Sequence, residues 1–216
     1  MVDLRALPAN GSQASLSEGD APAKAEGAAM MALARAAGSG DARAMKQLLE
    51  ALTSRVSRVV RVVLGAGHPE VDDVTQLSLI AFTQALSAFR GECQPTHYAS
   101  RIAVRTAVNA RRRSRALQAR HDDLSEAEGI ETSTAHDEVM AERRKRLVRD
   151  LLGVIPEEQA EALALRVALG WSLEEIAEAS GAPLNTVRSR LRLAKEALRK
   201  RIESDPVLRE ELEVTP

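Results

Sequence analysis

The sequence predicts an all-α protein with two helical domains, joined by a flexible acidic linker and preceded by a disordered N-terminal tail. Three observations support this fold class. Ala, Leu, Arg and Glu dominate the composition, and these residues favour helices over sheets. Apolar residues recur at spacings of three and four in several segments, which is the period of an amphipathic helix. Between these segments lies a stretch that carries acids without Lys or Arg, which indicates a domain boundary.

The composition excludes several classes of protein. The formal net charge is −1, so a uniformly basic nucleic-acid coat is excluded, and charge has to be examined segment by segment. The single cysteine, Cys93, cannot form an intrachain disulfide, which favours a reducing cytoplasm. No apolar run approaches the roughly 20 residues that span a bilayer, and the N-terminus lacks a secretory signal. Catalytic and metal-binding motifs are missing, so the sequence predicts a cytoplasmic protein without enzymatic activity, metal or cofactor.

The N-terminal half predicts a disordered extension over residues 1–38 and a helical domain over residues 39–120. Ala, Gly, Ser and Pro dominate the extension, which leaves room only for a short helix at 28–37. Helices are expected from the N-cap Asp41 to Gly65, from 69 to 88 and from 96 to 117. Their predicted inward residues are Met45, Leu48, Leu49, Leu52, Val56, Val59, Val60 and Val63, then Val74, Leu77, Ile80, Ala81, Ala85 and Phe89, then Ile102, Ala103, Thr106 and Ala110.

The C-terminal half predicts an acidic linker over residues 121–138, a second helical domain over 139–205 and a tail over 206–216. Ser172 and Glu175 form a capping box, a local pattern that marks the start of a helix. Helices are expected at 139–152, at 156–169, from Ser172 to Ser180 and from Pro183 to Ile202.

Residues 172–200 carry the sharpest functional signal, because they predict a helix-turn-helix with Gly181 in the turn. Between residues 185 and 201, seven basic residues stand against one acid, Glu196. A helix in the major groove needs polar groups near its N-terminal end and cations along its length. DNA binding is therefore favoured over a solvated basic helix in an ordinary bundle. The residues expected to face DNA include Asn185, Arg188, Ser189, Arg190, Arg192 and Lys195.

Two further charged segments lie in the N-terminal half. The stretch from Arg101 to Arg120 holds seven arginines, and there is no acid between Cys93 and His121, which favours contact with phosphates or a solvated helix end. Asp72, Asp73 and Gln76 lack the further oxygen donors that a metal site needs. On the residues alone, helix capping and an acidic patch for a basic protein partner remain equal alternatives for this group.

Both halves resemble RNA polymerase sigma factors of the extracytoplasmic-function (ECF) group, over about residues 40–205. The resemblance to their region two lies in Asp72–Gln76, Phe89-Arg90-Gly91, Arg101-Ile102-Ala103 and Arg111-Arg112-Arg113, in the order of the family. The resemblance to their region four lies in Ile155-Pro156, Gly170–Ala177 and Thr186–Leu191. The family implies a region 2 helical bundle and a region 4 helix-turn-helix as the two domains.

The resemblance also implies partners and residue roles. The partners are core RNA polymerase (its β′ and β subunits), promoter DNA and an anti-sigma factor, with no membrane insertion. Tyr98-Ala99-Ser100 stand where the family has Trp-Leu-Tyr, which implies weaker stacking and weaker promoter melting. The implied sites are Asp72, Asp73 and Gln76 for the polymerase; Arg90, Gly91, Tyr98, Arg101, Arg105, Arg111, Arg112 and Arg113 for the minus-ten element; and Asn185, Thr186, Arg188, Ser189, Arg190, Arg192 and Lys195 for the minus-thirty-five element.

Two alternative functions follow from the same residues. A stand-alone helix-turn-helix regulator would bind an operator as a dimer, although the sequence shows neither a dimer seam nor a sensor domain. A helical adaptor would bind a polymerase or an anti-sigma protein without contacting DNA. The leading hypothesis is a sigma factor that directs promoter-specific transcription initiation.

Overall fold

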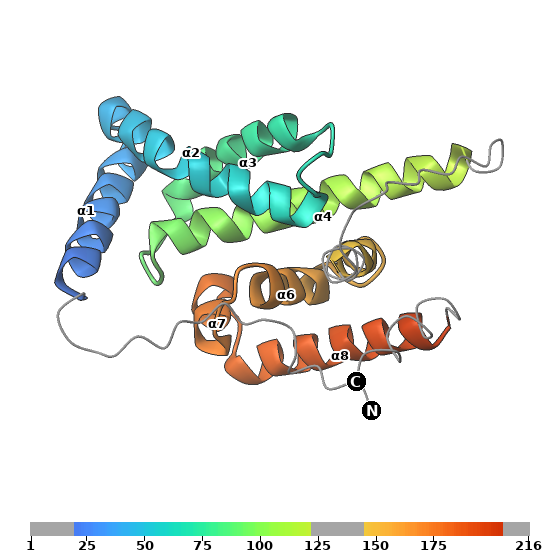
Figure 1. Cartoon of the computed structure of the whole chain (residues 1–216). Coiled ribbons are helices and arrows are strands. Elements are labelled where there is room, and N and C mark those ends of the chain that lie inside the picture. Colours follow the sequence, from blue (N-terminus) through green and yellow to red (C-terminus); the bar gives the residue numbers. More distant parts are fainter. Residues whose placement is uncertain (1–19, 122–144, 205–216) are drawn as a thin grey trace.

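The computed structural model describes residues 20–121 and 145–204, and within these ranges every regular element is a helix (Figure 1). The elements form an N-terminal half (residues 20–121) and a C-terminal half (residues 145–204), which lie against each other. This arrangement confirms the predicted all-α fold. None of the described helices is both long enough and apolar enough to cross a bilayer.

The N-terminal half is a bundle whose helices start and stop at local sequence signals. Asp41 caps the second helix, because its carboxylate accepts hydrogen bonds from the backbone N–H groups of Arg43 (2.8 Å) and Ala44 (3.1 Å). Gly65 ends that helix with a φ of 107°, a conformation that favours glycine. The elements are α1 (Asp20–Gly38), α2 (Ala42–Leu64), α3 (Val71–Ala85), the 3₁₀ helix η2 (Leu86–Ala88) and α4 (Pro95–His121).

Helix α1 corrects the predicted boundary at residue 38, because it contains the short helix expected at 28–37 and extends it back to Asp20. It begins at Asp20 and packs against α2, η2 and α4, with Ala34 and Ala37 buried. Alanine has the highest helix propensity, and its small side chain allows close helix packing, so an alanine-rich composition is compatible with an ordered helix. Residues 1–19 lie outside the described part of the chain.

The C-terminal half is built around the predicted helix-turn-helix. Residues 145–152 are helical, and α6 (Glu157–Ala168), α7 (Leu173–Ser180) and α8 (Leu184–Glu203) follow. The capping box at α7 is confirmed: Glu175 N–H donates to Ser172 Oγ (3.0 Å), and Ser172 N–H donates to Glu175 Oε2 (2.7 Å). Gly181 adopts a left-handed conformation (φ 63°) and turns the chain from α7 into α8.

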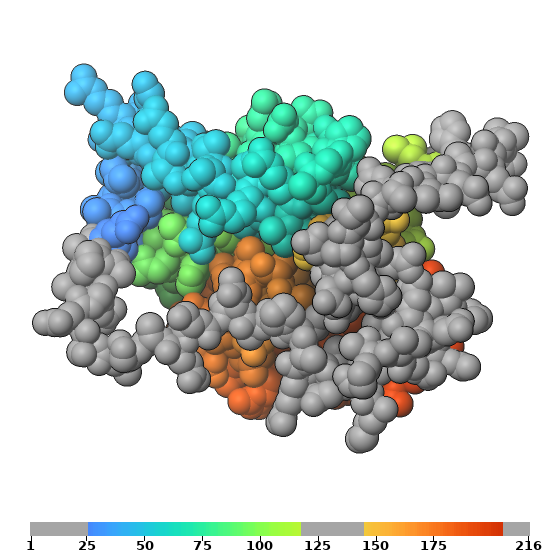
Figure 2. All heavy atoms as spheres, in the orientation of Figure 1, coloured from blue at the N-terminus to red at the C-terminus, as the bar shows by residue number. Residues whose placement is uncertain are grey.

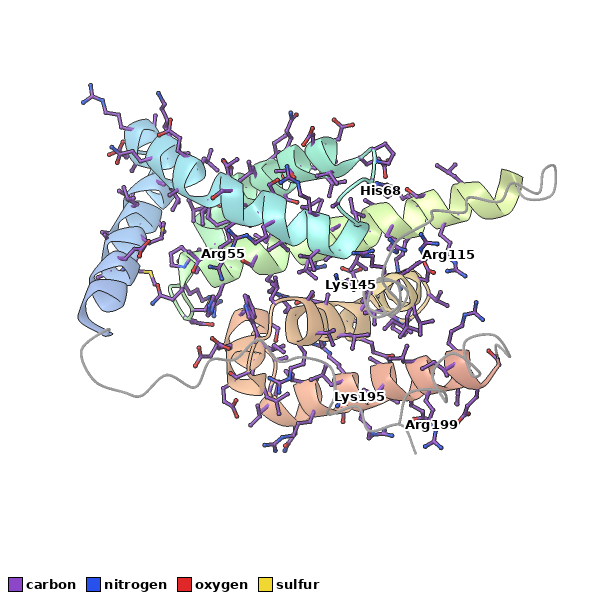
Figure 3. The ribbon with its side chains drawn as sticks, in the orientation of Figure 1. Arg55, His68, Arg115, Lys145, Lys195 and Arg199 are labelled. Carbon is purple, nitrogen blue, oxygen red and sulfur yellow. The ribbon has the colours of Figure 1, made fainter. Side chains whose placement is uncertain are left out.

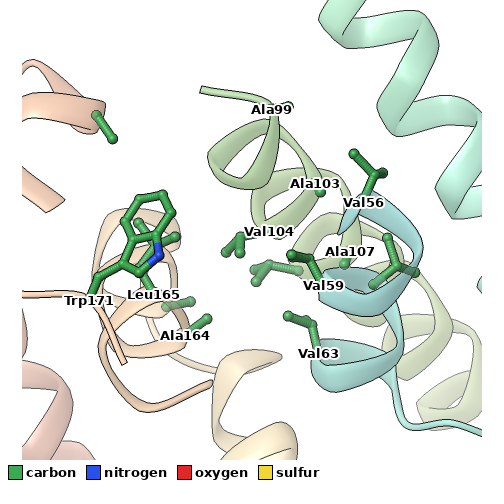
Figure 4. Close-up of a cluster of buried hydrophobic side chains, with 14 of the residues drawn as sticks. Val56, Val59, Val63, Ala99, Ala103, Val104, Ala107, Ala164, Leu165 and Trp171 are labelled. Atoms are coloured by element: carbon green, nitrogen blue, oxygen red, sulfur yellow. The ribbon is translucent and has the colours of Figure 1, made fainter. Parts of the chain in front are cut away.

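The core runs through both halves without a break. In the N-terminal half, Val59 and Val63 of α2 pack towards small residues of α4, such as Ala107 (Figure 4). Val104 of α4 lies on the other side of that helix, towards Leu165 and Trp171 of the C-terminal half. Helix α4 is therefore buried on two faces, which explains why Val104, Ala107 and Val108 are buried although the single-stripe pattern omitted them.

The two halves meet chiefly where α4 packs against α6 and α7. We call the contact of α4 and the end of α2 with residues 145–180 the interface between the halves. In the space-filling view the blue-green N-terminal half and the orange helices touch directly (Figure 2). Most of the predicted acidic linker, from residue 122 to the end of the prediction at 138, falls outside the described residues.

Candidate nucleic-acid and protein interfaces

Helix α3 turns apolar side chains towards solvent, which corrects its predicted core stripe. Leu77 is 46% exposed and Ile80 is 53% exposed, whereas Phe82 is fully buried. The inward positions are taken by Thr75 and Ser78, whose hydroxyls donate to the backbone carbonyls one turn earlier (2.7 Å each). These hydroxyls are satisfied within their own helix, so they are buried at low cost.

The exposed side of α3 combines acidic, amide and apolar groups. Asp73, Gln76, Leu77 and Ile80 are spaced by three and four residues, so they share one helix face, and Asp72 lies beside them in the first turn. The first-turn position of Asp72 and Asp73 also favours the helix dipole. Dipole interactions do not account for two large exposed apolar side chains on the same face. This combination is typical of a protein-binding surface.

Helix α8 presents the predicted DNA-reading face. Its apolar side, Val187, Leu191, Ala194 and Leu198, is buried, so the opposite side faces outward. Glu196 neutralises little of the positive charge of this face. It lies 3.5 Å from Arg192, but both side chains remain well exposed to solvent, which weakens the ion pair. Figure 3 shows Lys195 and Arg199 on this helix. Asn185, Arg188, Ser189, Arg192 and Lys195 are exposed, and Thr186 and Arg190 are half-buried.

The loop between η2 and α4 borders a cavity of about 300 Å³. In this loop Gly91 has a φ of 75°. The Arg90 side chain is 83% exposed and forms a long ion pair of 3.9 Å with Glu92. Helix α1 forms the opposite wall, and the sequence had given this segment no part in a site. The cavity is lined by Ala34, Arg35, Gly38, Ser39, Leu86, Ser87, Phe89, Arg90 and Gly91.

Tyr98 packs into the bundle behind this loop. Its ring lies 4.9 Å from the Phe89 ring and 6.1 Å from the Phe82 ring, measured between centroids. Its hydroxyl donates to the Ala85 carbonyl at 3.4 Å, and the residue is half-buried. The ring therefore fixes the position of the loop, and only part of its surface can stack on a base.

The arginines of α4 contact the C-terminal half. Arg101 Nε lies 2.6 Å from Glu161 Oε1, Arg105 Nε lies 2.9 Å from Glu157 Oε1, and Arg111 Nη2 lies 2.6 Å from Asp150 Oδ1. Arg112 donates to the Ile155 carbonyl. Of the five arginines predicted in this segment for the minus-ten element, Arg113 alone makes no such contact among the described residues, and it is exposed.

Comparison with known proteins assigns the chain to a family. The Sigma-70 region 2 family matches residues 48–117, and the Sigma-70 region 4 family matches residues 145–198. The ECF RNA polymerase sigma-E factor of Salmonella typhimurium (strain 14028s) is 32% identical over 178 residues, which cover 79% of this chain and 91% of that relative. The chain belongs to the ECF sigma factors.

Two solved structures also align with the chain. CnrH in complex with the cytosolic domain of CnrY aligns at 24% identity and a TM-score of 0.48, covering 82% of this chain and 99% of that chain. The sigma factor RpoE in complex with the anti-sigma factor NepR from Bartonella quintana aligns at 20% identity and a TM-score of 0.44, covering 74% of this chain and 97% of that chain.

The sigma factor distributes its predicted site residues over four surfaces. The polymerase set lies together on α3, and the minus-thirty-five set lies together on α8. The minus-ten set is divided, because Arg90 and Gly91 lie at the loop while most of the arginines face the C-terminal half. Sequence reasoning missed the carboxylates opposite them, since Glu157 lies in the first turn of its own helix, where an acid has a local explanation.

Proposed function

We propose that this sigma factor binds core RNA polymerase through the exposed face of α3. The observation that supports this proposal is the outward placement of Asp73 and Gln76 beside Leu77 and Ile80. The carboxylate attracts a basic partner, and burial of the two apolar side chains supplies favourable free energy. Within the described residues, the side chains of Asp73 and Gln76 form no hydrogen bond or ion pair that would be lost on binding.

For the promoter, we propose two separate contacts. The loop at Arg90 and Gly91, with the cavity beside it, accepts an unpaired base of the minus-ten element, and the α4 arginines neutralise phosphates of the same strand. Helix α8 enters the major groove at the minus-thirty-five element, with Arg188 and Arg192 towards base edges and phosphates.

We further propose that the protein acts in the cytoplasm, without catalytic activity, metal or cofactor of its own. Its partner there is the polymerase, which carries the chemistry of RNA synthesis. Control by an anti-sigma factor is proposed from membership of the ECF group.

Transcription from a cognate promoter with purified core polymerase tests the α8 assignment. Arg188→Ala with Arg192→Ala is expected to abolish promoter selection while core binding persists, because each good base contact contributes about 1–3 kcal/mol. The matched control, Arg199→Ala with Lys200→Ala, removes the same charge from the last turns of the same helix. A chain that binds DNA but never core polymerase would support the stand-alone regulator, and unchanged transcription by the first variant would support the adaptor.

Co-purification with core polymerase tests the α3 assignment. Asp73→Ala with Gln76→Ala is expected to lose the polymerase without loss of helical structure, since both side chains are exposed. Retention of full core binding by this double variant would contradict the assignment.

A further inference from the structure

The basic face of α4 is covered by carboxylates from α6. Arg101 Nε and Glu161 Oε1 are 2.6 Å apart, with side chains only 23% and 8% exposed. Arg105 bridges two acids, at 2.9 Å from Glu157 and 3.8 Å from Glu161. Glu161 therefore lies buried against two guanidinium groups. A buried carboxylate is costly unless it is paired, so this contact is specific in both position and sign of charge.

A second polar cluster lies at the other end of the interface between the halves. Arg111 donates to Asp150 Oδ1 (2.6 Å) and to the Leu64 carbonyl (3.2 Å). Arg112 donates to the Ile155 carbonyl, and Arg115 Nη1 lies 3.4 Å from the Asp150 carbonyl oxygen. Figure 3 shows Arg115 close to the junction of the halves. The anionic and carbonyl oxygens of the C-terminal half thus receive the hydrogen bonds that phosphate oxygens would otherwise receive.

Apolar and aromatic contacts complete the interface. The His97 ring of α4 lies 4.5 Å from the ring of Trp171, which is 4% exposed. Burial lowers the pKa of His97 below its ordinary value of 6.5, and Arg55 lowers it further, while Glu175 and Glu178 raise it. The neutral imidazole is therefore the form that fits against the indole.

We propose that the basic face of α4 is a docking surface for the chain's own C-terminal half, which competes with the minus-ten strand of the promoter. This inference rests on the proposed minus-ten role of the α4 arginines. In the closed form Glu157, Glu161 and Asp150 engage Arg101, Arg105 and Arg111, so those arginines are unavailable to phosphates. The free sigma factor is thereby held away from single-stranded DNA, and opening exposes the arginines.

Two physical features make this competition both effective and reversible. The halves belong to one chain, so docking is intramolecular and has an effective concentration in the millimolar range, of order ~1 mM. At the edge of the interface, the lining of a cavity of about 390 Å³ holds more arginines than acids. A DNA strand with one phosphate per nucleotide offers denser negative charge to the same face. The cavity is lined by Leu64, His68, Arg111, Ser114, Arg115, Arg146, Arg149, Asp150 and Gly153.

The closed form is tested by energy transfer within the full-length chain, in the absence of polymerase and DNA. Dyes are attached at Ser54→Cys on α2 and Ser204→Cys after α8, both exposed, in a Cys93→Ala background. Glu157→Gln with Glu161→Gln is expected to lower the transfer efficiency, because loss of the charged hydrogen bonds reduces the closed-to-open ratio about tenfold or more.

A matched control separates pairing from net charge. Glu158→Gln with Glu174→Gln makes the same change in net charge at exposed positions that form no ion pair within the described residues. This control is expected to keep the efficiency of the unsubstituted protein. Binding of a minus-ten single-stranded oligonucleotide is expected to tighten about tenfold in the first variant and to change little in the control.

Equal transfer efficiency in the first variant and the control would overturn the proposal. If circular dichroism shows that the variant has lost helix, the test is instead the salt dependence of the labelled parent protein. A transfer efficiency that falls when NaCl is raised from about 0.1 M to about 1 M supports closure by charge, and a constant efficiency overturns the proposal. Because this readout needs neither polymerase nor promoter, its failure is distinguishable from failure of the proposed transcription function. Unchanged oligonucleotide binding in a demonstrably opened variant would refute the competition alone.

Discussion

The exposed apolar pair on α3 gives a quantitative test of polymerase docking. Full burial of a Leu or Ile side chain contributes about 1.5–3 kcal/mol, and about half of Leu77 (46% exposed) and Ile80 (53% exposed) remains to be buried. Each side chain can therefore supply about 1 kcal/mol on binding. Leu77→Ala with Ile80→Ala is expected to weaken the affinity for core polymerase by about 2 kcal/mol, or roughly thirtyfold.

The assay is competition between the variant and labelled parent protein for core polymerase. The free energy of unfolding of the variant should change little, because neither side chain belongs to the core. Leu117→Ala with Val154→Ala is the control, since these residues are 58% and 57% exposed but do not belong to α3. Equal core affinity for the variant and the control would refute the reasoning that places the polymerase on this face.

Three further predictions concern stability and closure. Ser172→Ala removes the cap of α7 and should lower the free energy of unfolding by about 1 kcal/mol in urea titrations, a result contradicted by an unchanged midpoint. Phe82→Ala should cost about 3–5 kcal/mol because the ring is fully buried, and a thermal midpoint equal to that of the parent would show that the site can collapse without loss. Burial lowers the pKa of His97 in the closed form. As pH falls, His97 is therefore protonated more readily in the open form than in the closed form, and closure should weaken below about pH 6.5. Energy transfer measured against pH checks this, and His97→Asn should remove that part of the pH dependence.

Local signals allowed much of the fold to be predicted. The cap at Asp41, the capping box at Ser172 and the left-handed Gly181 each depend on a few neighbouring residues, and the structure confirms all three. The apolar stripes of α2 and α8 were also predictable, because each helix buries one continuous face. The exposed face of α8 then follows from its buried face.

Helix α3 shows where the same reasoning fails. A periodic pattern identifies helix faces, but it cannot decide which face is buried when small hydroxyl residues occupy the other one. Thr75 and Ser78 satisfy their hydroxyls within the helix and pack inward, which leaves Leu77 and Ile80 outside. The two apolar residues that the periodic pattern assigned to the core are therefore the ones available to a partner.

The α4 arginines could not have been placed from the sequence. Arg101 and Glu161 are separated by 60 positions, and their pairing depends on how the two halves pack. In isolation, a cationic helix and an acidic first turn each have an ordinary local explanation. Only the three-dimensional arrangement shows that the two charges neutralise each other.

The closed form leaves α3 accessible while it covers Arg101 and Arg105, which has a consequence for the order of binding. Under the two proposals, polymerase docking at Asp73 needs no opening, whereas the minus-ten strand has to displace Glu157 and Glu161. A ligand shifts an equilibrium only by its differential affinity for the two forms, so docking on α3 alone should leave the closed-to-open ratio unchanged.

Glu157→Gln with Glu161→Gln is therefore expected to tighten binding of the single strand without changing core affinity in the α3 competition assay. Combined with Leu77→Ala and Ile80→Ala, its effects on the two ligands should add, because the two groups of residues share no described contact. A gain in core affinity as large as the gain for the strand would mean that the polymerase also selects the open form. The apparent affinity of the closed protein for core would then be reduced by the fraction of molecules that are open.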